Sequence, residues 1–342
     1  MKNRFLCVFL FVVFTATAVF PPRVAEAASL SLAAPSVVLL DGGTVVYAKF
    51  PHAKRAPAST TKLVTVMVAL DHLPLDRIVT IPPGLEYIQP SKIGLYGGER
   101  FYVRDLVKAA LVKSANDAAE ALAILTAGSR PAFARLMNQK AQSVGAYNSR
   151  FVNPAGLPAE GQYSTAFDLA RIIMAASRYP YLVQAMKVRE AAISTLDGRR
   201  IYLRNCNKML WRTSSVIGKT GWTRTAKHCF AGRVQAGNRV IYVGIMGSAR
   251  RQYLWSDLVR ISAFASGGTF TPVKIEGGGL PSRKDTRNIQ KALQRAGYFK
   301  GNPTGFFGKR TKSAVRNFQK ANDLPVTGTV GPRTWKKLKK FM

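Results

Sequence analysis

A Gly- and Pro-rich stretch at residues 267–284, GGTFTPVKIEGGGLPSRK, divides this chain into two unequal parts. It has no sustained hydrophobic period, which is typical of a linker rather than of a helix or strand. The chain has 342 residues, 47% of them hydrophobic, which is enough for two separate cores. We therefore predict a large domain over residues 28–266 and a small module over residues 285–342.

The first 27 residues have the pattern of a signal peptide. Lys2 and Arg4 precede an apolar run over residues 5–20, and the small-residue sequence AEAA follows. A retained membrane anchor is the alternative, but the run is shorter than the about 20 residues that a spanning helix needs. The sequence therefore predicts cleavage after Ala27 and export to the periplasm or cell envelope.

The charge balance indicates an anionic partner. Lys+Arg 51 against Asp+Glu 17 gives a net charge of +34, and many of these cations lie in residues 283–342. Such a surface attracts nucleic acid, anionic wall polymers or anionic membrane lipid. Because export disfavours nucleic acid, we predict peripheral contact with wall polymers or membrane lipid and no nucleic-acid partner.

The large domain combines β-rich ends with a helical middle. Two β-rich runs over residues 36–50 surround Asp41-Gly42-Gly43, a turn typical of a hairpin. Residues 63–70 are apolar on nearly every face, which predicts a helix buried all round. Four helical patterns follow, at residues 103–114, 116–128, 130–145 and 165–178. Strand patterns lie at residues 216–222 and 228–248, and a last helical pattern lies at residues 252–265. This order predicts an α+β domain with an antiparallel sheet.

Three cysteines are present, and Cys7 leaves with the signal peptide. Cys206 and Cys229 remain in a protein that matures in an oxidising space, so a disulfide between them and two buried free thiols both fit the sequence. The three histidines are scattered, and no His/Cys cluster has the spacing of a metal site. We predict no metal and no cofactor.

Ser59 and Lys62 form the first pattern that carries chemistry. A separation of three residues on a helix places both side chains on one face. A serine hydroxyl needs a base to take its proton, and a lysine supplies one when burial disfavours its charged form. The alternative is a capping serine beside a lysine whose amine reaches solvent, and the spacing alone is common by chance.

Two further patterns narrow the choice. The triplet Ser114-Ala115-Asn116 stands at the start of a predicted helix. The alternative there is that Asn116 or Asp117 only caps the helix, with Glu120 forming a capping box with Asp117. The triplet Lys219-Thr220-Gly221 lies on a strand, where the alternative is a solubilising lysine at a sheet edge. Glycines flank the Lys219-Thr220 pair and allow another backbone to approach closely.

All three patterns, in this order, resemble the motif set of penicillin-binding proteins and class A β-lactamases. Residues 153–172, NPAGLPAEGQYSTAFDLARI, also resemble the connector of serine D-alanyl-D-alanine carboxypeptidases of the low-molecular-mass penicillin-binding type, peptidase family S11. The likeness covers residues 33–265 and implies a β-lactamase/transpeptidase-like domain, an antiparallel sheet with a helical subdomain. One departure is Gln162, where these enzymes often carry a histidine.

The resemblance implies that three residues are catalytic. Ser59 attacks the carbonyl between two D-alanines, and Lys62 accepts its proton. Ser114 relays a proton to the departing amine, and water then releases the acyl-enzyme. Peptidoglycan stem peptides are the implied substrates, and β-lactam antibiotics are the implied acylating inhibitors.

The resemblance also implies the substrate-binding residues. One amide holds the substrate peptide and helps to orient the base, and a lysine and a threonine hold the terminal carboxylate. The backbone N–H groups of Ser59 and Trp222 form the oxyanion hole. The substrate-binding set is Asn116, Lys219, Thr220, Gly221 and Trp222, with Arg250 or Arg251 as a weak addition.

Three other functions compete with this prediction. A Ser-His-Asp triad needs a histidine beside a recognisable motif, and none of the three histidines has one. A β-lactamase needs a carboxylate to activate the deacylating water, and the nearby candidate, Glu160, lacks the asparagine expected after it. A wall-binding protein with weak catalysis is disfavoured because the three motifs are intact. We therefore predict a D,D-carboxypeptidase.

The C-terminal module shows three amphipathic helical patterns, at residues 288–299, 311–322 and 333–341. Its Gln-x-x-Leu helix, Gly-Tyr turn and Gly-x-x-Thr-x-x-Ala-Val-x-x-Phe-Gln core resemble the small three-helix peptidoglycan-binding domain. Thr304-Gly305 and Thr327-Gly328 stand where many such modules have Asp-Gly. A module that holds the wall raises the local substrate concentration for the enzyme. Residues expected in its core are Leu293, Tyr298, Val315, Phe318 and Trp335.

Overall fold

A computed structural model describes residues 30–267, 283–324, 326, 328, 330 and 332–342. The predicted signal peptide and nearly all of the predicted linker lie outside the described residues. Within the described ranges, no helix has both the length and the apolar character that crossing a membrane requires.

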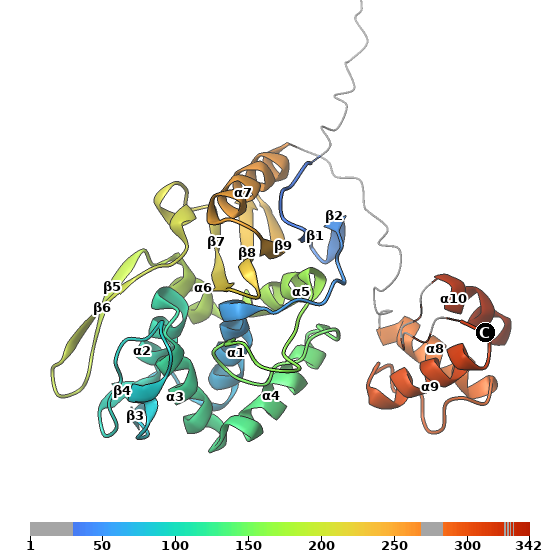
Figure 1. Cartoon of the computed structure of the whole chain (residues 1–342), viewed down its shortest axis with the longest axis horizontal. Coiled ribbons are helices and arrows are strands. Elements are labelled where there is room, and N and C mark those ends of the chain that lie inside the picture. The colour runs from blue at the N-terminus through green and yellow to red at the C-terminus, as the bar shows by residue number, and fades with distance from the viewer. Residues whose placement is uncertain (1–29, 268–282, 325, 327, 329, 331) are drawn as a thin grey trace, which may run out of the picture. The chain divides into compact units, whose positions relative to one another are not determined.

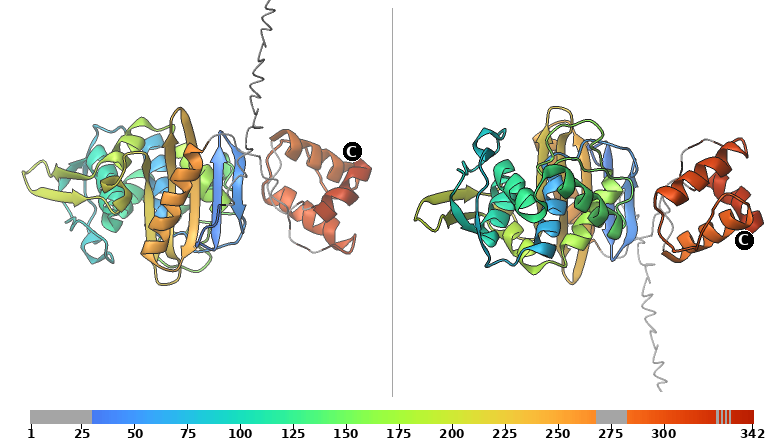
Figure 2. Two further views of the ribbon diagram at one scale, coloured as in Figure 1. Left: turned by 90° about the horizontal axis from the view of Figure 1, so that it is seen from above. Right: turned by 90° about the horizontal axis from the view of Figure 1, so that it is seen from below.

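A five-stranded antiparallel sheet in the order β2-β1-β9-β8-β7 organises the large domain (Figure 1). Gly42 and Gly43 have φ of 54° and 96°, as the predicted hairpin turn requires. Two helices, α5 (Ala166–Ala176) and α7 (Arg251–Ser266), pack against the central strands (Figures 1 and 2). The α+β prediction is confirmed. The strands are β1 (Ser36–Asp41), β2 (Thr44–Lys49), β7 (Val216–Thr223), β8 (Lys227–Ala236) and β9 (Arg239–Ser248).

The helical part surrounds α1 (Lys62–His72), which begins after a short 3-10 turn, η1 (Ala58–Thr61). The residues of α1 from Lys62 through Ala69 are all buried, which confirms the prediction of a helix buried on every face. Ser59 lies in η1 and not in the first turn of α1, because the chain is wound more tightly before the α-helix begins. The helices α3 (Asn116–Ala127) and α4 (Arg130–Ser143) pack against α1, and α2 (Val103–Lys108) packs against α3.

Several short elements were not predicted from the sequence. Four are strands that form two separate antiparallel pairs, β3 with β4 and β5 with β6. Their runs of three to five residues are too short for a hydrophobic period to identify them. The unpredicted elements are β3 (Ile78–Thr80), η2 (Leu85–Tyr87), β4 (Arg100–Tyr102), α6 (Pro180–Lys187), β5 (Glu190–Ser194), β6 (Arg200–Arg204) and η4 (Lys208–Trp211). The π-helical turn η3 (Ala109–Lys113) lies inside the helix predicted over residues 103–114.

The C-terminal module consists of helices around a small apolar core. Its first helix begins at Arg283, inside the stretch predicted as linker. Leu293, Val315 and Phe318 are buried in its core, and Tyr298 and Trp335 are partly buried against it. The elements are α8 (Arg283–Arg295), α9 (Lys309–Lys320), α10 (Pro332–Leu338) and η5 (Lys339–Phe341).

Two buried glutamines of the module hold glycine turns in the same way. Gln290 Oε1 accepts a hydrogen bond from the Gly305 N–H at 2.8 Å, and Gln319 Oε1 accepts one from the Gly328 N–H at 2.8 Å. Both glycines have positive φ, 76° and 72°. The glycine N–H groups therefore hold both turns at the positions where many such modules have Asp-Gly. This contact does not require an aspartate before the glycine.

Candidate active site

The Ser59 hydroxyl and the Lys62 amine meet at the junction between η1 and α1. Lys62 Nζ lies 3.0 Å from Ser59 Oγ, which is a hydrogen-bond distance. Ala58, directly before Ser59, has φ of 48°, a left-handed conformation that a residue with a side chain adopts only when its surroundings impose it. This turn holds the serine at the start of a buried helix, with its hydroxyl beside the amine.

The Lys62 amine is buried among hydrogen-bond acceptors. It donates to Asn116 Oδ1 and to the Ala155 carbonyl, each at 2.7 Å. Burial lowers the pKa of Lys62 well below its ordinary value, and the positive charge of Lys219 lowers it further. A neutral amine has two N–H donors and one lone pair, so the two acceptors leave the lone pair for the Ser59 hydroxyl.

The connector between α4 and α5 places the Ala155 carbonyl. Asn153 Oδ1 accepts from the Gly156 N–H at 2.8 Å, and Gln162 Oε1 accepts from the Asn153 N–H at 3.2 Å. Gly156 has φ of 80°, and a Cβ there would lie 1.9 Å from the Ala58 carbonyl oxygen, so only glycine fits. Gln162 thus fastens the connector at the position where the resemblance expects a histidine.

Lys219 and Ser114 form a second buried lysine–serine contact. Lys219 Nζ donates to Ser114 Oγ at 2.8 Å and to the Thr220 carbonyl at 2.9 Å. Lys219 is 1% exposed, and burial lowers its pKa to about 8. The interpretation as a solubilising lysine is therefore wrong, although β7 is an edge strand. Ser114 reaches Lys219 because it leaves η3 with φ of 63°.

Asn116 and Asp117 begin α3, but no side chain caps this helix. Asn116 Oδ1 faces Lys62, and its Nδ2 donates to the Gln89 carbonyl at 2.9 Å. The Asp117 carboxylate accepts from the backbone N–H groups of residues 93–95. The capping interpretation is therefore wrong for Asn116. For Asp117 it misses most of the contacts, because Oδ1 accepts from the Ala118 N–H in the first turn but the other partners are distant in sequence.

β7 passes close to η1 at Gly221. A Cβ on Gly221 would lie 2.9 Å from Ser59 N and 3.0 Å from Ala58 Cβ. The close approach confirms that this position needs a glycine. The backbones of Ser59 and Trp222 consequently border the same cavity.

A cavity of about 640 Å³ opens over these groups. Arg251 lines it, whereas Arg250 and Glu160 are not among its lining residues. Lys62 and Lys219 are buried behind the two serines that they contact. Predicted residues on its wall are Ser59, Ser114, Asn116, Thr220, Gly221 and Trp222. Unpredicted residues on its wall are Gln89, Pro90, Ser91, Gly156, Leu157, Pro158, Cys206, Lys208, Thr223, Arg224, His228, Leu254 and Trp255.

Cys206 and Cys229 are free thiols, so the disulfide alternative is wrong. Cys229 is buried in β8, where its Sγ contacts the carbonyls of Ala56 and Ala226 at 3.8 Å and 3.6 Å. Cys206 is exposed, and its Sγ lies 3.5 Å from the Lys113 carbonyl. The two sulfur atoms therefore have separate partners.

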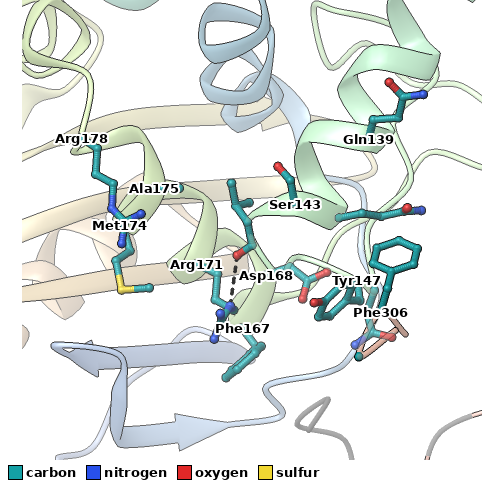
Figure 3. A pocket seen from close by; sticks show the side chains of 15 residues that line it. Gln139, Ser143, Tyr147, Phe167, Asp168, Arg171, Met174, Ala175, Arg178 and Phe306 are labelled. Carbon is teal, nitrogen blue, oxygen red and sulfur yellow. Dashed lines mark hydrogen bonds between the residues drawn. The ribbon is translucent and has the colours of Figure 1, made fainter. Parts of the chain in front are cut away.

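The side chains of α4, α5 and the segment between them that Figure 3 draws include none of the predicted site residues. Arg171 Nε donates to the Val144 carbonyl at 3.3 Å, and Ser149 Oγ donates to the buried Asp168 carboxylate at 2.7 Å. These contacts tie α5 to the segment before it. In the described ranges, no three His, Cys, Asp or Glu side chains form a group that could hold a metal ion.

A serine hydroxyl beside a buried lysine amine, on this α+β fold, defines a serine hydrolase of the Ser–Lys class. The family described as D-alanyl-D-alanine carboxypeptidase, peptidase S11, matches residues 23–249, and the peptidoglycan binding domain matches residues 282–338. The chain therefore belongs to the S11 family of D-alanyl-D-alanine carboxypeptidases and carries a C-terminal peptidoglycan binding domain. The predicted family and the transpeptidase-like fold are confirmed.

Known relatives are similar over most of this chain. The D-alanyl-D-alanine carboxypeptidase DacF of Bacillus subtilis is 30% identical over 240 residues, which are 68% of this chain and 62% of that protein. A D-alanyl-D-alanine endopeptidase of Escherichia coli is 32% identical over 289 residues, 82% of this chain and 88% of that protein. The crystal structure of a D-alanyl-D-alanine carboxypeptidase from Mycobacterium tuberculosis has a TM-score of 0.68 at 26% identity, covering 73% of this chain and 98% of that one. The match thus spans less than two thirds of DacF.

Proposed function

We propose that this protein is a serine-type D-Ala-D-Ala carboxypeptidase, which removes the terminal D-alanine from peptidoglycan stem peptides through an acyl-enzyme on Ser59. The observation that carries the proposal is the buried Lys62 amine 3.0 Å from the Ser59 hydroxyl, with its other two contacts satisfied by Asn116 and Ala155. Membership of the S11 family supports the substrate class.

The acylation step uses Lys62 as the base. Its neutral amine takes the proton as Ser59 Oγ attacks the carbonyl carbon of the D-Ala–D-Ala bond. The backbone N–H groups of Ser59 and Trp222 stabilise the tetrahedral oxyanion. As the C–N bond breaks, Ser114 passes a proton to the departing D-alanine amine. Water then hydrolyses the ester and restores the serine.

Lys219 and Thr220 bind the terminal carboxylate of the substrate in this proposal. Thr220 lines the cavity, and Lys219 lies directly behind Ser114, 2.8 Å from its hydroxyl. A β-lactam antibiotic also presents a carboxylate next to a reactive amide, so it acylates Ser59 in the same orientation.

The location that we propose is outside the cytoplasm, in the periplasm or cell envelope. The predicted signal peptide, the peptidoglycan binding domain and the net charge of +34 support it. A module that holds wall polymer keeps stem peptides near the enzyme and raises their local concentration.

Product analysis with the full chain tests the proposal. Incubation with a D-Ala-D-Ala stem pentapeptide is expected to release D-alanine, and a chromogenic cephalosporin is expected to remain bound to Ser59. Ser59→Ala should lose both reactions. Because one relative is named an endopeptidase, a cross-linked muropeptide dimer is included to separate cross-link cleavage from trimming. Rapid repeated turnover of the cephalosporin would identify a β-lactamase instead. Binding to wall sacculi without either reaction would identify a wall-binding protein.

The pH dependence of acylation should have two limbs. The rate rises with pH as Lys62, whose pKa burial lowers, loses its proton and becomes a base. It falls near pH 8, where Lys219 loses the positive charge that holds the substrate carboxylate. Single-turnover acylation by a D-Ala-D-Ala peptide measures both limbs. A peptide with an amidated C-terminus is the control, and a falling limb that persists with it would contradict the role of Lys219.

A further inference from the structure

The loop of residues 89–95 forms one wall of the cavity and contacts Asn116. Gln89, Pro90 and Ser91 line the cavity. The Gln89 carbonyl accepts from Asn116 Nδ2 at 2.9 Å, and the Ser91 carbonyl accepts from the Asn116 backbone N–H at 2.7 Å. The Gln89 carbonyl thus fixes which end of the side-chain amide faces Lys62, and the Ser91 carbonyl holds the Asn116 backbone beside the loop. The position of the loop therefore sets the orientation of a group that contacts the base.

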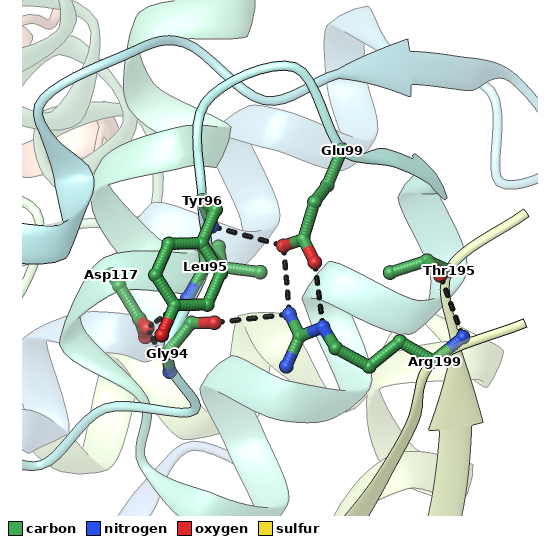
Figure 4. Close-up of polar contacts among 7 residues, drawn as sticks. All are labelled: Gly94, Leu95, Tyr96, Glu99, Asp117, Thr195 and Arg199. Atoms are coloured by element: carbon green, nitrogen blue, oxygen red, sulfur yellow. Dashed lines mark hydrogen bonds and ion pairs between the residues drawn. The ribbon is translucent and has the colours of Figure 1, made fainter. Parts of the chain in front are cut away.

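One anchor of this loop is the Asp117 carboxylate, which is fully buried. Its Oδ2 accepts from the Ile93 N–H at 3.0 Å. It also accepts from the N–H groups of Gly94 and Leu95 at 2.9 and 3.2 Å (Figure 4). Three successive N–H groups on one carboxylate oxygen fix the path of the backbone through charge-assisted hydrogen bonds. Asp117 comes directly after Asn116, so a single turn of α3 holds both the amide and the loop that orients it.

The second anchor is Arg199, from the turn between β5 and β6 (Figure 4). Its Nε and Nη2 donate to the two carboxylate oxygens of Glu99 at 2.6 and 2.7 Å, and Nη2 also donates to the Gly94 carbonyl at 3.0 Å. Glu99 in turn accepts from the Tyr96 N–H at 2.9 Å. Gly94 is thus held by Asp117 through its N–H and by Arg199 through its carbonyl.

We propose that Asp117 and Arg199 are positioning residues for acylation: they fix the loop of residues 89–95 so that its Gln89 carbonyl keeps Asn116 Oδ1 directed at Lys62. The proposal rests on the proposed function, because it assigns these residues a part in the same proton transfer. Neither side chain lines the cavity, so both act through the loop.

The pH profile separates this role from a general loss of stability. The titratable groups that act on the pKa of Lys62 are Lys219, which lowers it, and Cys206, Glu120 and Asp117, which raise it. Asp117→Asn removes one raising charge and weakens the contact between Asn116 and the amine. The rising limb of acylation should therefore move to lower pH, whereas a merely looser fold leaves the limb where it is.

A matched control is Asp257→Asn. Asp257 is also fully buried, and its carboxylate accepts from two successive backbone N–H groups, of Ala33 and Ala34, at 2.9 and 2.8 Å. Neither Asp257 nor these two alanines line the cavity. The control therefore removes the same kind of contact from a carboxylate that binds the segment before β1 instead of the loop of residues 89–95.

The experiment measures single-turnover acylation of the full chain by benzylpenicillin, from pH 5 to 10. Asp117→Asn is expected to slow acylation about 10- to 100-fold, in line with the cost of a misplaced group at a reacting centre, and Arg199→Gln is expected to slow it several-fold. The double variant should be slowed by less than the product of the two single-variant factors, because both residues hold the same loop. Asp257→Asn should react at the wild-type rate.

Four outcomes would overturn the proposal. They are a wild-type rate in Asp117→Asn, an unmoved rising limb in that variant, an equal loss in Asp257→Asn, and losses that simply multiply in the double variant. If Asp117→Asn does not fold, the acylation rate of Arg199→Gln tests the proposal instead. This variant is expected to fold because the Arg199 side chain, which pairs with Glu99, is partly exposed. Failure of the wild-type protein to react refutes the proposed function itself and is seen before any variant is compared.

Discussion

Lys62→Met is expected to slow acylation of Ser59 by about 10²- to 10⁴-fold, the usual contribution of a general base. Methionine fills a similar volume in the buried space but has no lone pair basic enough to take the serine proton. Single-turnover labelling with a fluorescent penicillin measures the loss. Lys108→Met is the control, because Lys108 is paired with Asp105 at 3.4 Å on α2 and does not line the cavity. Retention of the wild-type labelling rate in Lys62→Met would refute the assignment of the base.

The same variant should change how stability depends on pH. In the folded state the pKa of Lys62 is lowered, so between that pKa and 10.5 the unfolded chain binds a proton that the folded chain has released. Stability of the wild-type protein therefore rises with pH in this window, by at most about 1.4 kcal/mol per pH unit for one group. Lys62→Met removes this contribution, while Lys219, with its pKa lowered to about 8, still contributes one of the same sign. Urea unfolding at several pH values should show a shallower slope in the variant.

The three motifs were predictable because local spacing carries their geometry. Ser59 and Lys62 are three residues apart, and although the serine lies in η1, the 3-10 turn runs directly into α1 and keeps the contact at 3.0 Å. Lys219 was placed on a strand beside Gly221, and the close approach of Ser59 explains the glycine. The overall order of hairpin, helices, strands and last helix also follows from hydrophobic periods, which are strong in long elements.

The remaining parts of the site depend on backbone atoms and on contacts distant in sequence. The carbonyls of Gln89 and Ala155 orient Asn116 and Lys62, but any residue type supplies a carbonyl, so no sequence pattern marks them. Asp117 shows that the capping rule can also mislead, because the partners of its carboxylate are mostly backbone groups distant in sequence. An acid at a helix start predicts a cap, yet its carboxylate binds N–H groups of a loop more than twenty residues away in sequence.

Gly221→Ala should slow acylation about 10²- to 10³-fold, comparable to the loss of an oxyanion-hole donor. The added Cβ would lie 2.9 Å from Ser59 N and 3.1 Å from the Pro57 carbonyl oxygen, and these are backbone atoms that do not rotate away. β7 and η1 must therefore separate, which moves the N–H groups of Ser59 and Trp222 apart. Overpacking of this kind also costs about 1–3 kcal/mol of stability. Acylation is measured at a temperature where the variant is fully folded, so that the two effects are distinguished.

Gly267→Ala is the matched control for this substitution. A Cβ at Gly267, after the end of α7, would meet its nearest atom at an ordinary contact distance of 3.4 Å, so neither rate nor stability should fall. Benzylpenicillin and the stem peptide should be slowed alike by Gly221→Ala, because both form an oxyanion in the same place. A variant that loses stability but acylates at the wild-type rate would show that β7 and η1 can separate without disturbing the oxyanion hole, and would place that hole elsewhere.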